Sequence, residues 1–388
     1  MGAQEAYVTR AGPGALWRGG RPVLTALDIE LTERCDNRCI HCCINLPEHD
    51  REARSRELPT ERVLGALDEA AALGVLGVRF TGGEILLRDD LEQIYVHARR
   101  LGMRVTLMTN ARKLTSELAA LLVQMPPREP LEITAYGMHR ESYEAVSRVA
   151  GSFDEFRRGL ELLDVHAVPY VVKGTLLPPT IGEMEELEAW AATRPVVRDR
   201  AGFIYWLDLR LRRDDKAASR RIAKLRLSPE EGVAALARDP RAAAALRAEA
   251  VVQLTEPSDL LFTCGIGGRP CLDAYGMLQP CLTLRAPQVV YDLARGSLRE
   301  AVTEFFPGLR SLRALDPEYL RRCARCFLAG ICDQCPSKSW AEHGTLDTPV
   351  DYFCEVTQAR ARFIGLLRDG ELPWDVVDGK ERVKCLMQ

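Results

Sequence analysis

Several features that would assign this 388-residue chain to a broad functional class are missing from its sequence. Lys and Arg number 52 and Asp and Glu number 55, so no basic excess predicts binding to nucleic acid or to a membrane surface. No run of 18 apolar residues predicts a transmembrane helix, and the N-terminal residues do not read as a secretory signal. We therefore expect a cytoplasmic protein with neither nucleic acid nor membrane as a partner.

Cysteine is absent from the middle of the chain, although the chain holds 13 Cys residues in total. None occurs between residues 44 and 263, whereas four lie at 35–43, eight lie at 264–354, and Cys385 stands alone. A disulfide framework seldom leaves so long a gap, and reduced thiols fit a cytoplasmic location. Clusters with short gaps suit metal and iron–sulfur sites, because several thiolates must reach one centre.

Strand and helix patterns alternate between residues 24 and 210. Six short apolar runs predict strands at Leu24–Leu31, Leu76–Phe80, Arg104–Met108, Leu131–Tyr136, Tyr170–Leu176 and Phe203–Leu209. Helical patterns between them cover Thr60–Leu73, Asp90–Leu101, Thr115–Gln124, Phe153–Leu163 and Ile181–Ala192. This order predicts an α/β fold with a parallel sheet, whose chemistry lies at the carboxyl ends of the strands.

The first cysteine group reads Cys35-Asp-Asn-Arg-Cys39-Ile-His-Cys42 and directly follows the first predicted strand. Its three thiolates can hold three corners of a cube-shaped iron–sulfur cluster, which leaves one iron open to a further ligand. A zinc site or spare thiols are the alternative for these residues alone. Cys43 is extra, and we expect it to be an unligated neighbour.

A glycine motif, Phe80-Thr81-Gly82-Gly83-Glu84, follows the second predicted strand. Two glycines at a strand end let the backbone approach a ligand closely, and the carboxylate after them can pair with an ammonium group. A plain turn is the alternative for this motif alone.

Together the two motifs resemble the signature of the radical S-adenosylmethionine (SAM) enzymes, which implies a partial (β/α)6 TIM-like barrel. The resemblance implies that Cys35, Cys39 and Cys42 hold a [4Fe–4S] cluster whose open iron chelates SAM. An electron from the cluster then cleaves SAM to a 5′-deoxyadenosyl radical, which abstracts hydrogen from the substrate. His41 departs from the family, which usually has an aromatic residue at this place. The residues expected to bind SAM are Gly82, Gly83, Glu84, Thr109, Asn110, Thr134 and Arg210.

Candidate catalytic residues rest on strand-end position alone, and they are Tyr136, His139, Lys173 and Asp208. On the sixth predicted strand, a period of two places Asp208 and Arg210 on one face. If that face lines the barrel interior, Arg210 can hold a carboxylate. An exposed strand edge is the alternative.

The C-terminal thiols follow the pattern Cys264-x6-Cys271-x4-Gly276-x4-Cys281, then Cys323-x2-Cys326-x5-Cys332-x2-Cys335, then Cys354. A zinc ribbon would explain the four central thiols and leave the other four unexplained. The pattern resembles the SPASM extension of radical SAM enzymes, which carries two auxiliary [4Fe–4S] clusters, although one residue is missing before Cys335. The resemblance implies one cluster near the substrate, held by Cys264, Cys271, Cys281 and Cys335. An outer cluster would be held by Cys323, Cys326, Cys332 and Cys354, which makes three clusters in the chain.

These patterns predict five segments: an N-terminal extension at 1–23, the radical SAM partial barrel at 24–211, a connector at 212–256, the SPASM domain at 257–360 and a tail at 361–388. The connector reads as one or two exposed helices, with Ser228-Pro229-Glu230-Glu231 as a start signal. The Cys-rich segment has few long periodic stretches, so we expect its folding to depend on bound metal.

SPASM enzymes include peptide maturases, anaerobic sulfatase maturases and some small-molecule dehydrogenases. Leu282 stands where sulfatase maturases carry Asp, which argues against that activity. We therefore expect an oxidoreductase that crosslinks or oxidises a ribosomally made peptide. A dehydrogenase or rearranging enzyme for a small metabolite is the alternative, and a multi-cluster electron carrier is the non-enzyme alternative.

Only some two dozen residues precede the first predicted strand, so a peptide would need contacts with the barrel or a separate leader-recognition protein. An external donor such as flavodoxin or ferredoxin would supply electrons.

Overall fold

A long sheet runs through the computed structural model, which describes residues 17–18, 21–194, 203–206, 209–212, 214–253 and 256–386. Within these residues the sheet has nine strands in the order β10-β9-β8-β7-β6-β3-β11-β12-β13. Seven of them pair in parallel, and six of these seven follow the predicted runs within a few residues: β3 (Leu27–Thr32), β6 (Gly77–Gly82), β7 (Arg104–Thr109), β8 (Leu131–Thr134), β9 (Tyr170–Thr175) and β10 (Phe203–Trp206). The predicted α/β partial barrel is confirmed.

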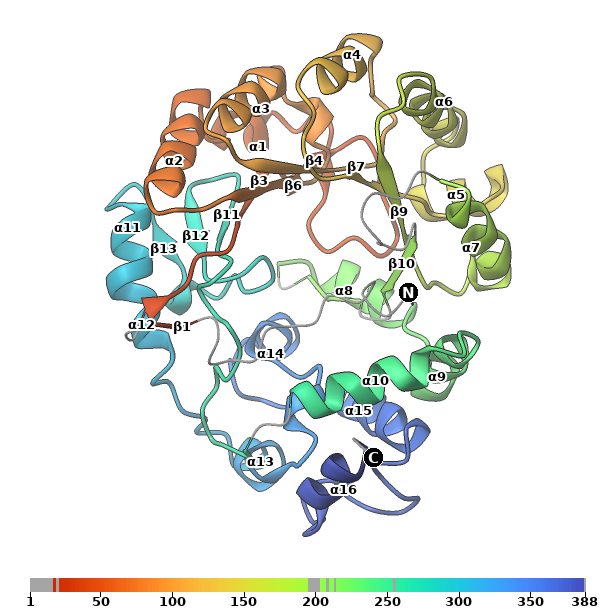
Figure 1. Cartoon of the computed structure of the whole chain (residues 1–388), viewed down its shortest axis with the longest axis vertical. Helices are drawn as coiled ribbons and strands as arrows, with labels where there is room; N and C mark the ends of the chain where they lie inside the picture. Colours follow the sequence, from red (N-terminus) through yellow and green to blue (C-terminus); the bar gives the residue numbers. More distant parts are fainter. Residues whose placement is uncertain are drawn as a thin grey trace.

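Helices cover the outside of this arc of strands (Figure 1). They are α1 (Arg51–Arg56), α2 (Thr60–Ala72), α3 (Leu91–Arg100), α4 (Ser116–Gln124), α5 (Arg140–Ser147), α6 (Ser152–Val165) and α7 (Met184–Ala192). The sequence patterns predicted five of them and missed α1 and α5, which are only six and eight residues long. Runs this short give a helical period little room to show itself.

Strand β3 shows how the sequence separates the two faces of the sheet. Leu27, Ile29 and Leu31 belong to the buried apolar core, which also contains Leu67 of α2 and Ile94 of α3. Because side chains alternate along a strand, the residues between them point to the opposite face, the inside of the arc. Those residues are Asp28, Glu30 and Thr32, and all three are buried. The inside of the barrel is therefore polar and charged.

The C-terminal part continues the same sheet, which no pattern predicted. Its strands β11 (Cys271–Leu272), β12 (Met277–Gln279) and β13 (Tyr291–Asp292) follow β3, and β11 pairs parallel to β3. Charged groups strengthen the contact between the C-terminal part and β3, because Arg285 donates hydrogen bonds of 2.6 Å to Glu30 and to Glu33. The sheet thus crosses the expected limit of the barrel, and the five-segment division stays a prediction.

The connector holds three helices, α8 (Lys216–Ala223), α9 (Pro229–Ala237) and α10 (Ala242–Val252), so the expectation of one or two was wrong. Ser228 caps α9 through a capping box with Glu231, as its sequence indicated. The remaining strands and α-helices of the described residues are β1 (Trp17–Arg18), β2 (Arg21–Pro22), β4 (Arg34–Cys35), β5 (Leu46–Pro47), α11 (Leu298–Glu300), α12 (Phe306–Leu309), α13 (Pro317–Arg321), α14 (Pro336–His343), α15 (Asp351–Phe363) and α16 (Gly379–Cys385). Among the described helices, none is long and apolar enough to cross a membrane.

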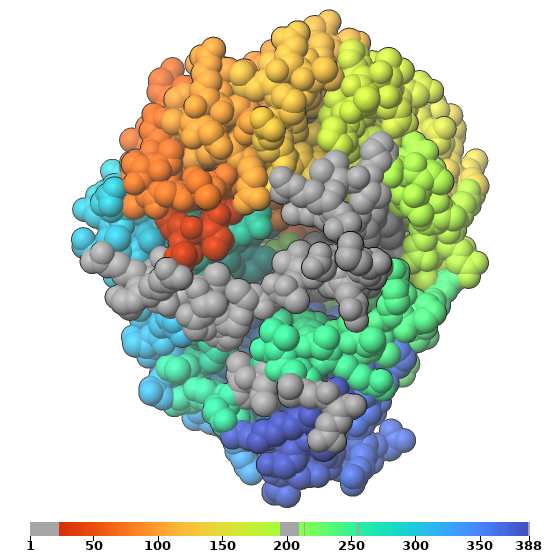
Figure 2. All heavy atoms as spheres, viewed as in Figure 1, coloured from red at the N-terminus to blue at the C-terminus, as the bar shows by residue number. Residues whose placement is uncertain are grey.

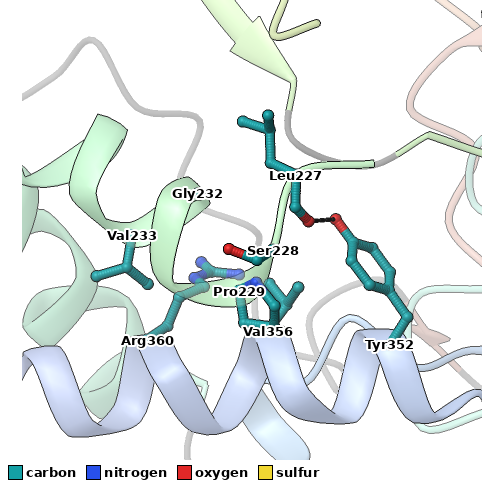
Figure 3. Close-up of a pocket in the computed structure, with 8 residues that line it drawn as sticks. All are labelled: Leu227, Ser228, Pro229, Gly232, Val233, Tyr352, Val356 and Arg360. Atoms are coloured by element: carbon teal, nitrogen blue, oxygen red, sulfur yellow. Dashed lines mark hydrogen bonds between the residues drawn. The ribbon is translucent and has the colours of Figure 1, made fainter. Parts of the chain in front are cut away.

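A small cavity lies where α9 packs against α15 (Figure 3). Its walls include Pro229 and Val356, and beside it the Tyr352 hydroxyl donates a hydrogen bond of 3.0 Å to the Leu227 carbonyl oxygen. Its volume of about 10 Å³ suffices for a single water molecule at most. The cavity is therefore a small gap between the two packed helices and not a substrate site.

Gly159 of α6 allows this helix to pack on the backbone that follows β7. A Cβ atom added at Gly159 would lie 2.0 Å from the Ala111 carbonyl oxygen, whereas one added at Gly65 of α2 would meet no atom within 4 Å. Ala111 itself adopts a left-handed φ of 62°, so the segment after β7 has little freedom to move away.

We expect Gly159→Ala to destabilise the fold by about 1–3 kcal/mol, because backbone must shift to relieve the overlap. The matched change Gly65→Ala should stabilise it by roughly 0.5–1 kcal/mol, since alanine favours an unobstructed helix interior. Urea unfolding of both variants measures the two free energies. A Gly159→Ala variant as stable as the parent would contradict the close contact.

The ion pair of Arg285 with Glu30 predicts a pH-dependent stability. Burial raises the pKa of Glu30 to about 7 even though Arg285 opposes the shift. An acid whose pKa is raised on folding stabilises the fold while it is protonated, and this contribution disappears as the pH rises through the folded pKa.

We expect Arg285→Gln to cost about 2–4 kcal/mol at pH 8.5, where Glu30 is left as a buried acid without its cation. The cost should be smaller at pH 6, where that carboxyl group is protonated. The control is Arg313→Gln, which removes an exposed ion pair with Asp259 and should cost under about 1 kcal/mol at both pH values. Urea unfolding at the two pH values is the measurement, and a loss independent of pH would refute the role of Glu30.

Candidate functional site

The first cysteine loop follows β3 and is closed by the pairing of β4 with β5. Cys35 and Cys39 are buried and Cys42 is half-buried, and burial raises the pKa of Cys42 to about 11. Cys39 lies close enough to both other thiols for their charges to interact. In the described part of the chain, no three His, Cys, Asp or Glu side chains are placed to hold a single metal ion. Three neighbouring thiols can serve a cluster in which each cysteine binds a different iron.

Arg112 holds this loop in place, although no motif pointed to it. Its Nη1 atom donates hydrogen bonds of 2.6 Å to the Asp36 carbonyl oxygen and 2.7 Å to Asn37 Oδ1. Its other side pairs with Glu155 of α6. Asn110 adds a bond of 2.7 Å from its side-chain amide to Asp36 Oδ1. The end of β7 therefore positions the loop that carries the thiols.

Gly82 and Gly83 pack against the backbone that enters the cysteine loop. A Cβ atom added at Gly82 would lie 2.2 Å from the Thr32 carbonyl oxygen, and one at Gly83 would lie 2.1 Å from that of Arg34. Gly82 also has a φ of 125°, which L side chains rarely adopt. The glycines thus allow two backbones to approach each other, which is a reason that the sequence did not reveal. Their contact with SAM stays a prediction.

Glu84 is fully buried beside the cysteine loop. Its carboxylate accepts hydrogen bonds from the Thr109 hydroxyl at 2.6 Å, the Asn110 amide at 2.8 Å and the Leu86 amide at 3.0 Å. Burial first and the nearby Asp36 second raise the pKa of Glu84 to about 7, and no cation is among the groups that shift it most. These hydrogen bonds hold Thr109 and Asn110 to Glu84. The buried carboxyl group of Glu84 can bind a further hydrogen-bond donor or a cation.

The other residues expected to bind SAM are less clearly placed. Thr134 ends β8 and pairs in register with Lys173 of β9. Arg210 is half-buried and follows Leu209, which packs in an apolar cluster that Ile40 of the cysteine loop also contacts. Asp208 lies outside the described residues.

Arg212 comes close to the thiols without any sequence signal. It donates a hydrogen bond of 2.9 Å to the Asn45 carbonyl oxygen, and its charge acts on Cys42. Two residues further along the same segment, Asp214 pairs with it. A cation next to a thiol favours the thiolate that metals require.

Tyr136 lies at the first cysteine loop, where its hydroxyl hydrogen-bonds the Cys39 thiol. Its ring meets that of His41 edge to face, with 5.6 Å between the centroids. Burial lowers the pKa of His41 to about 4, so this imidazole is neutral at pH 7. His41 thus supplies a neutral aromatic ring at the place where the family usually has an aromatic residue.

The structure separates His139 and Lys173. His139 is exposed at the start of α5, where its Nε2 atom lies 3.0 Å from Glu186, and it is not brought to the thiols. Lys173 is buried on β9 and forms an ion pair with Glu132 of β8. Burial lowers the pKa of Lys173, and Glu132 opposes that shift. Of the two candidates His139 and Lys173, only Lys173 lies in the charged interior of the barrel.

The C-terminal thiols divide into two sets of mutually interacting groups. The first set contains Cys264, Cys281 and Cys335. The second contains Cys323, Cys326, Cys332 and Cys354. A zinc ribbon would instead group Cys335 with Cys323, Cys326 and Cys332, so this alternative does not fit.

Three remaining cysteines are not among the groups that act most strongly on either set. Cys271 lies in β11 and is fully buried. Cys43 is half-buried next to Cys42, and Cys385 is exposed at the end of α16. Figure 2 shows a recess on this face beside the red and orange part of the barrel, with teal atoms at its floor.

Comparison with known proteins points to one superfamily. Residues 29–191 match the family model of the radical SAM superfamily. PqqA peptide cyclase from Streptomyces rochei is 45% identical over 91 residues, which cover 24% of this chain and 24% of that protein. The chain spans between 24% and 50% of the length of the first curated relatives that it matches.

Two solved structures share the fold over most of the chain. SuiB from Streptococcus suis bound to SAM has a TM-score of 0.64 and 16% identity, covering 86% of this chain and 77% of that chain. SuiB is also known bound to its precursor peptide SuiA. The protein anSMEcpe with bound SAM has a TM-score of 0.57 and 12% identity, covering 94% of this chain and 99% of that chain.

The family match includes both the Cys35–Cys42 loop and the Gly82-Gly83-Glu84 motif, which the fold brings together. The structural matches are longer than residues 29–191, so the shared fold extends into the Cys-rich C-terminal part. This chain therefore carries a domain of the radical SAM superfamily at residues 29–191.

Proposed function

We propose that this protein is a radical SAM enzyme that crosslinks or otherwise oxidises a peptide. One observation carries the proposal: the Glu84 amide bonds the Arg34 carbonyl oxygen at 2.8 Å, directly before Cys35. This bond places a buried acid beside three neighbouring thiols. A site for SAM needs both, because the thiols hold the cluster while the acid accepts hydrogen bonds from the part of SAM that the open iron binds.

The residues of the first loop fit a [4Fe–4S] cluster. Cys35, Cys39 and Cys42 would hold it, and Asp36 and Asn37 between them are already fixed by Arg112. When bound, the cluster supplies the electron that cleaves SAM, the source of the radical that removes hydrogen from the substrate. Thr109 and Asn110 orient Glu84 toward this place. Contacts of Thr134 and Arg210 with SAM belong to the same proposal.

The C-terminal thiols support two auxiliary iron–sulfur clusters. The four thiols of the second set are enough for a fully ligated cluster, which suits electron transfer. Hydrogen bonds already reach two of its sulfurs, from the Gln334 amide to Cys332 at 3.4 Å and from the Gln358 side chain to Cys354 at 3.2 Å. Such bonds stabilise negative charge on sulfur and help to set the reduction potential. The electrons would come from an external donor such as flavodoxin or ferredoxin.

A peptide is the substrate class that the similarities favour. PqqA peptide cyclase is a relative over 91 residues, and SuiB shares the fold and binds a precursor peptide. The charged interior of the barrel, with Glu132, Lys173 and Arg79, offers groups that can hold a polar side chain or a peptide backbone. A separate leader-recognition protein is the partner that such a substrate would require if the barrel alone does not bind it.

The proposal predicts that the reconstituted protein cleaves SAM. After anaerobic loading with iron and sulfide, dithionite should produce 5′-deoxyadenosine, measured by liquid chromatography and mass spectrometry. Cys35→Ala should abolish this product, because the first cluster loses a ligand, whereas Cys385→Ala should not change it. Protein with about twelve irons per chain that makes no 5′-deoxyadenosine would refute the radical reaction.

A second experiment tests the substrate class. With short peptides encoded beside this gene, a product lighter by about two hydrogens per event would support crosslinking, and an unchanged peptide would favour a small metabolite.

Tyr136 predicts a measurable effect on the first cluster. Its hydroxyl bonds Cys39, and a donor to a ligating sulfur favours the reduced, more negative cluster. Tyr136→Phe should therefore lower the reduction potential by roughly 40 mV, the equivalent of about 1 kcal/mol for one electron. Anaerobic titration followed by electron paramagnetic resonance measures the potential. Tyr143→Phe is the matched control, since this ring contacts Tyr136 with 5.4 Å between centroids; an equal shift in both variants would disprove the role of the Tyr136 hydroxyl.

A further inference from the structure

Helix α8 presents positive charge to the solvent. Four exposed cations lie on this helix or directly after it: Lys216, Arg220, Arg221 and Lys224. Residues four apart on a helix are neighbours on its surface, so these side chains share one side of α8. Ala218 and Ile222 are buried on the opposite side. The helix is therefore amphipathic, and cations dominate its outer side.

Two more exposed cations lie at the first cysteine loop. Arg38, between Cys35 and Cys39, donates a hydrogen bond of 2.9 Å from Nη2 to the carbonyl oxygen of Arg148, the residue after α5. The backbones also meet there, because the Arg38 amide donates a bond of 2.9 Å to the Ser147 carbonyl oxygen. Both arginines are exposed. The cysteine loop therefore carries positive charge on its outer side.

One apolar cluster joins the three elements that carry these cations. Ile222 of α8 and Val146 of α5 are buried in it, and Ile40 of the cysteine loop packs against it. The cations therefore border one region of the protein, next to the loop that carries the thiols. We call this set the basic surface, and its residues are Arg38, Arg148, Lys216, Arg220, Arg221 and Lys224.

Ion pairs do not balance the basic surface. In the part of the chain that the structure describes, none of its six residues forms an ion pair, and the two acids that precede α8 are already engaged. Asp214 pairs with Arg212, and Asp215 accepts a hydrogen bond of 2.8 Å from the Ala218 amide. Residues 209–226 contain eight basic and two acidic residues, although the net charge of the whole chain is −3. Positive charge is thus concentrated here.

The position of the basic surface favours one kind of partner. Under the proposed function, each cleavage of SAM consumes one electron that must enter from outside the chain. Electron transfer slows steeply with distance, so the donor must approach the protein close to the cysteine loop. Flavodoxins and ferredoxins are small proteins that give single electrons and carry an excess of Asp and Glu. Their charge is complementary to that of the basic surface, which would steer and orient them.

We propose that the basic surface is the docking site of an acidic electron-transfer protein that reduces the first cluster. The donor is oxidised by one electron and the cluster is reduced by one, and no bond forms or breaks between the two proteins. This inference rests on the proposed function, since it names the surface that serves the cluster proposed there. Single-stranded nucleic acid fits less well, because no aromatic side chain among the described residues is exposed for base stacking.

A binding measurement tests the surface without turnover. Reconstituted protein without SAM is titrated with oxidised flavodoxin in a calorimeter, at about 50 mM and about 300 mM NaCl. We expect Arg220→Glu/Arg221→Glu to bind about tenfold more weakly than wild type at the lower salt concentration, and most of this difference to disappear at the higher one. The matched control Arg100→Glu/Arg299→Glu changes the net charge equally on α3 and α11 and should bind like wild type. Equal affinities in all three proteins, or an equal loss in both double variants, would overturn the inference.

Two reductants separate the docking surface from the proposed function. With dithionite, which needs no docking, Arg220→Glu/Arg221→Glu should form 5′-deoxyadenosine at the wild-type rate. With limiting reduced flavodoxin, its rate should fall about tenfold. A flavodoxin-driven rate equal to that of wild type would contradict the inference. Wild-type protein that binds flavodoxin but forms no product with either reductant would instead count against the proposed function.

A neutral variant guards against misfolding. Arg220→Gln/Arg221→Gln removes both charges without adding acids, and its flavodoxin-driven rate should fall by about threefold. Circular dichroism checks that each variant is folded, and the neutral variant decides the test if the acidic one is not. A loss that also occurs with dithionite, and only when a peptide is present, would assign the surface to the substrate and overturn the inference.

Discussion

The hydrogen bonds between the Gly82-Gly83-Glu84 turn and the end of β3 are the contact on which the site depends. Gly83 N bonds the Thr32 carbonyl oxygen at 2.7 Å, and Glu84 N bonds that of Arg34 at 2.8 Å. They require glycine at two places, since any Cβ there would overlap the opposing backbone. Through them the β6 turn fixes both the start of the cysteine loop and the position of the buried acid. The loop and the acid therefore cannot move independently of each other.

Charge in the interior connects this site to the rest of the molecule. The inner face of β3 carries Asp28 and Glu30, whose burial would be costly without partners. Arg79 of the barrel and Arg269 and Arg285 of the C-terminal part supply these partners. The same arginines thus neutralise the barrel interior and attach the C-terminal sheet strands to β3. A chain that folded only one of the two parts would leave charges buried and unpaired.

Short motifs carried most of the information about chemistry. Three thiols within eight residues and a Gly-Gly-Glu turn are local patterns, because the covalent chain itself holds their members close together. The strands and longer helices were also predictable, since their apolar periods extend over enough residues to be distinct. Strand-end position was a poorer guide for Tyr136 and His139. It placed both near the carboxyl end of β8. Only packing decides that Tyr136 turns to Cys39 and that His139 turns to the surface.

By itself, the sequence determined the α/β class, the first cysteine loop, the acid that follows β6 and the existence of a Cys-rich C-terminal part. Only the tertiary structure decided which distant groups meet, such as Arg112 and Arg212 at the cysteine loop. It also placed Cys271 in a two-residue strand beside β3, too short to leave a periodic signal. The physical reason is the same in each case. Local patterns depend on spacing along the chain, whereas these contacts depend on how separate strands pair and how buried charges find partners.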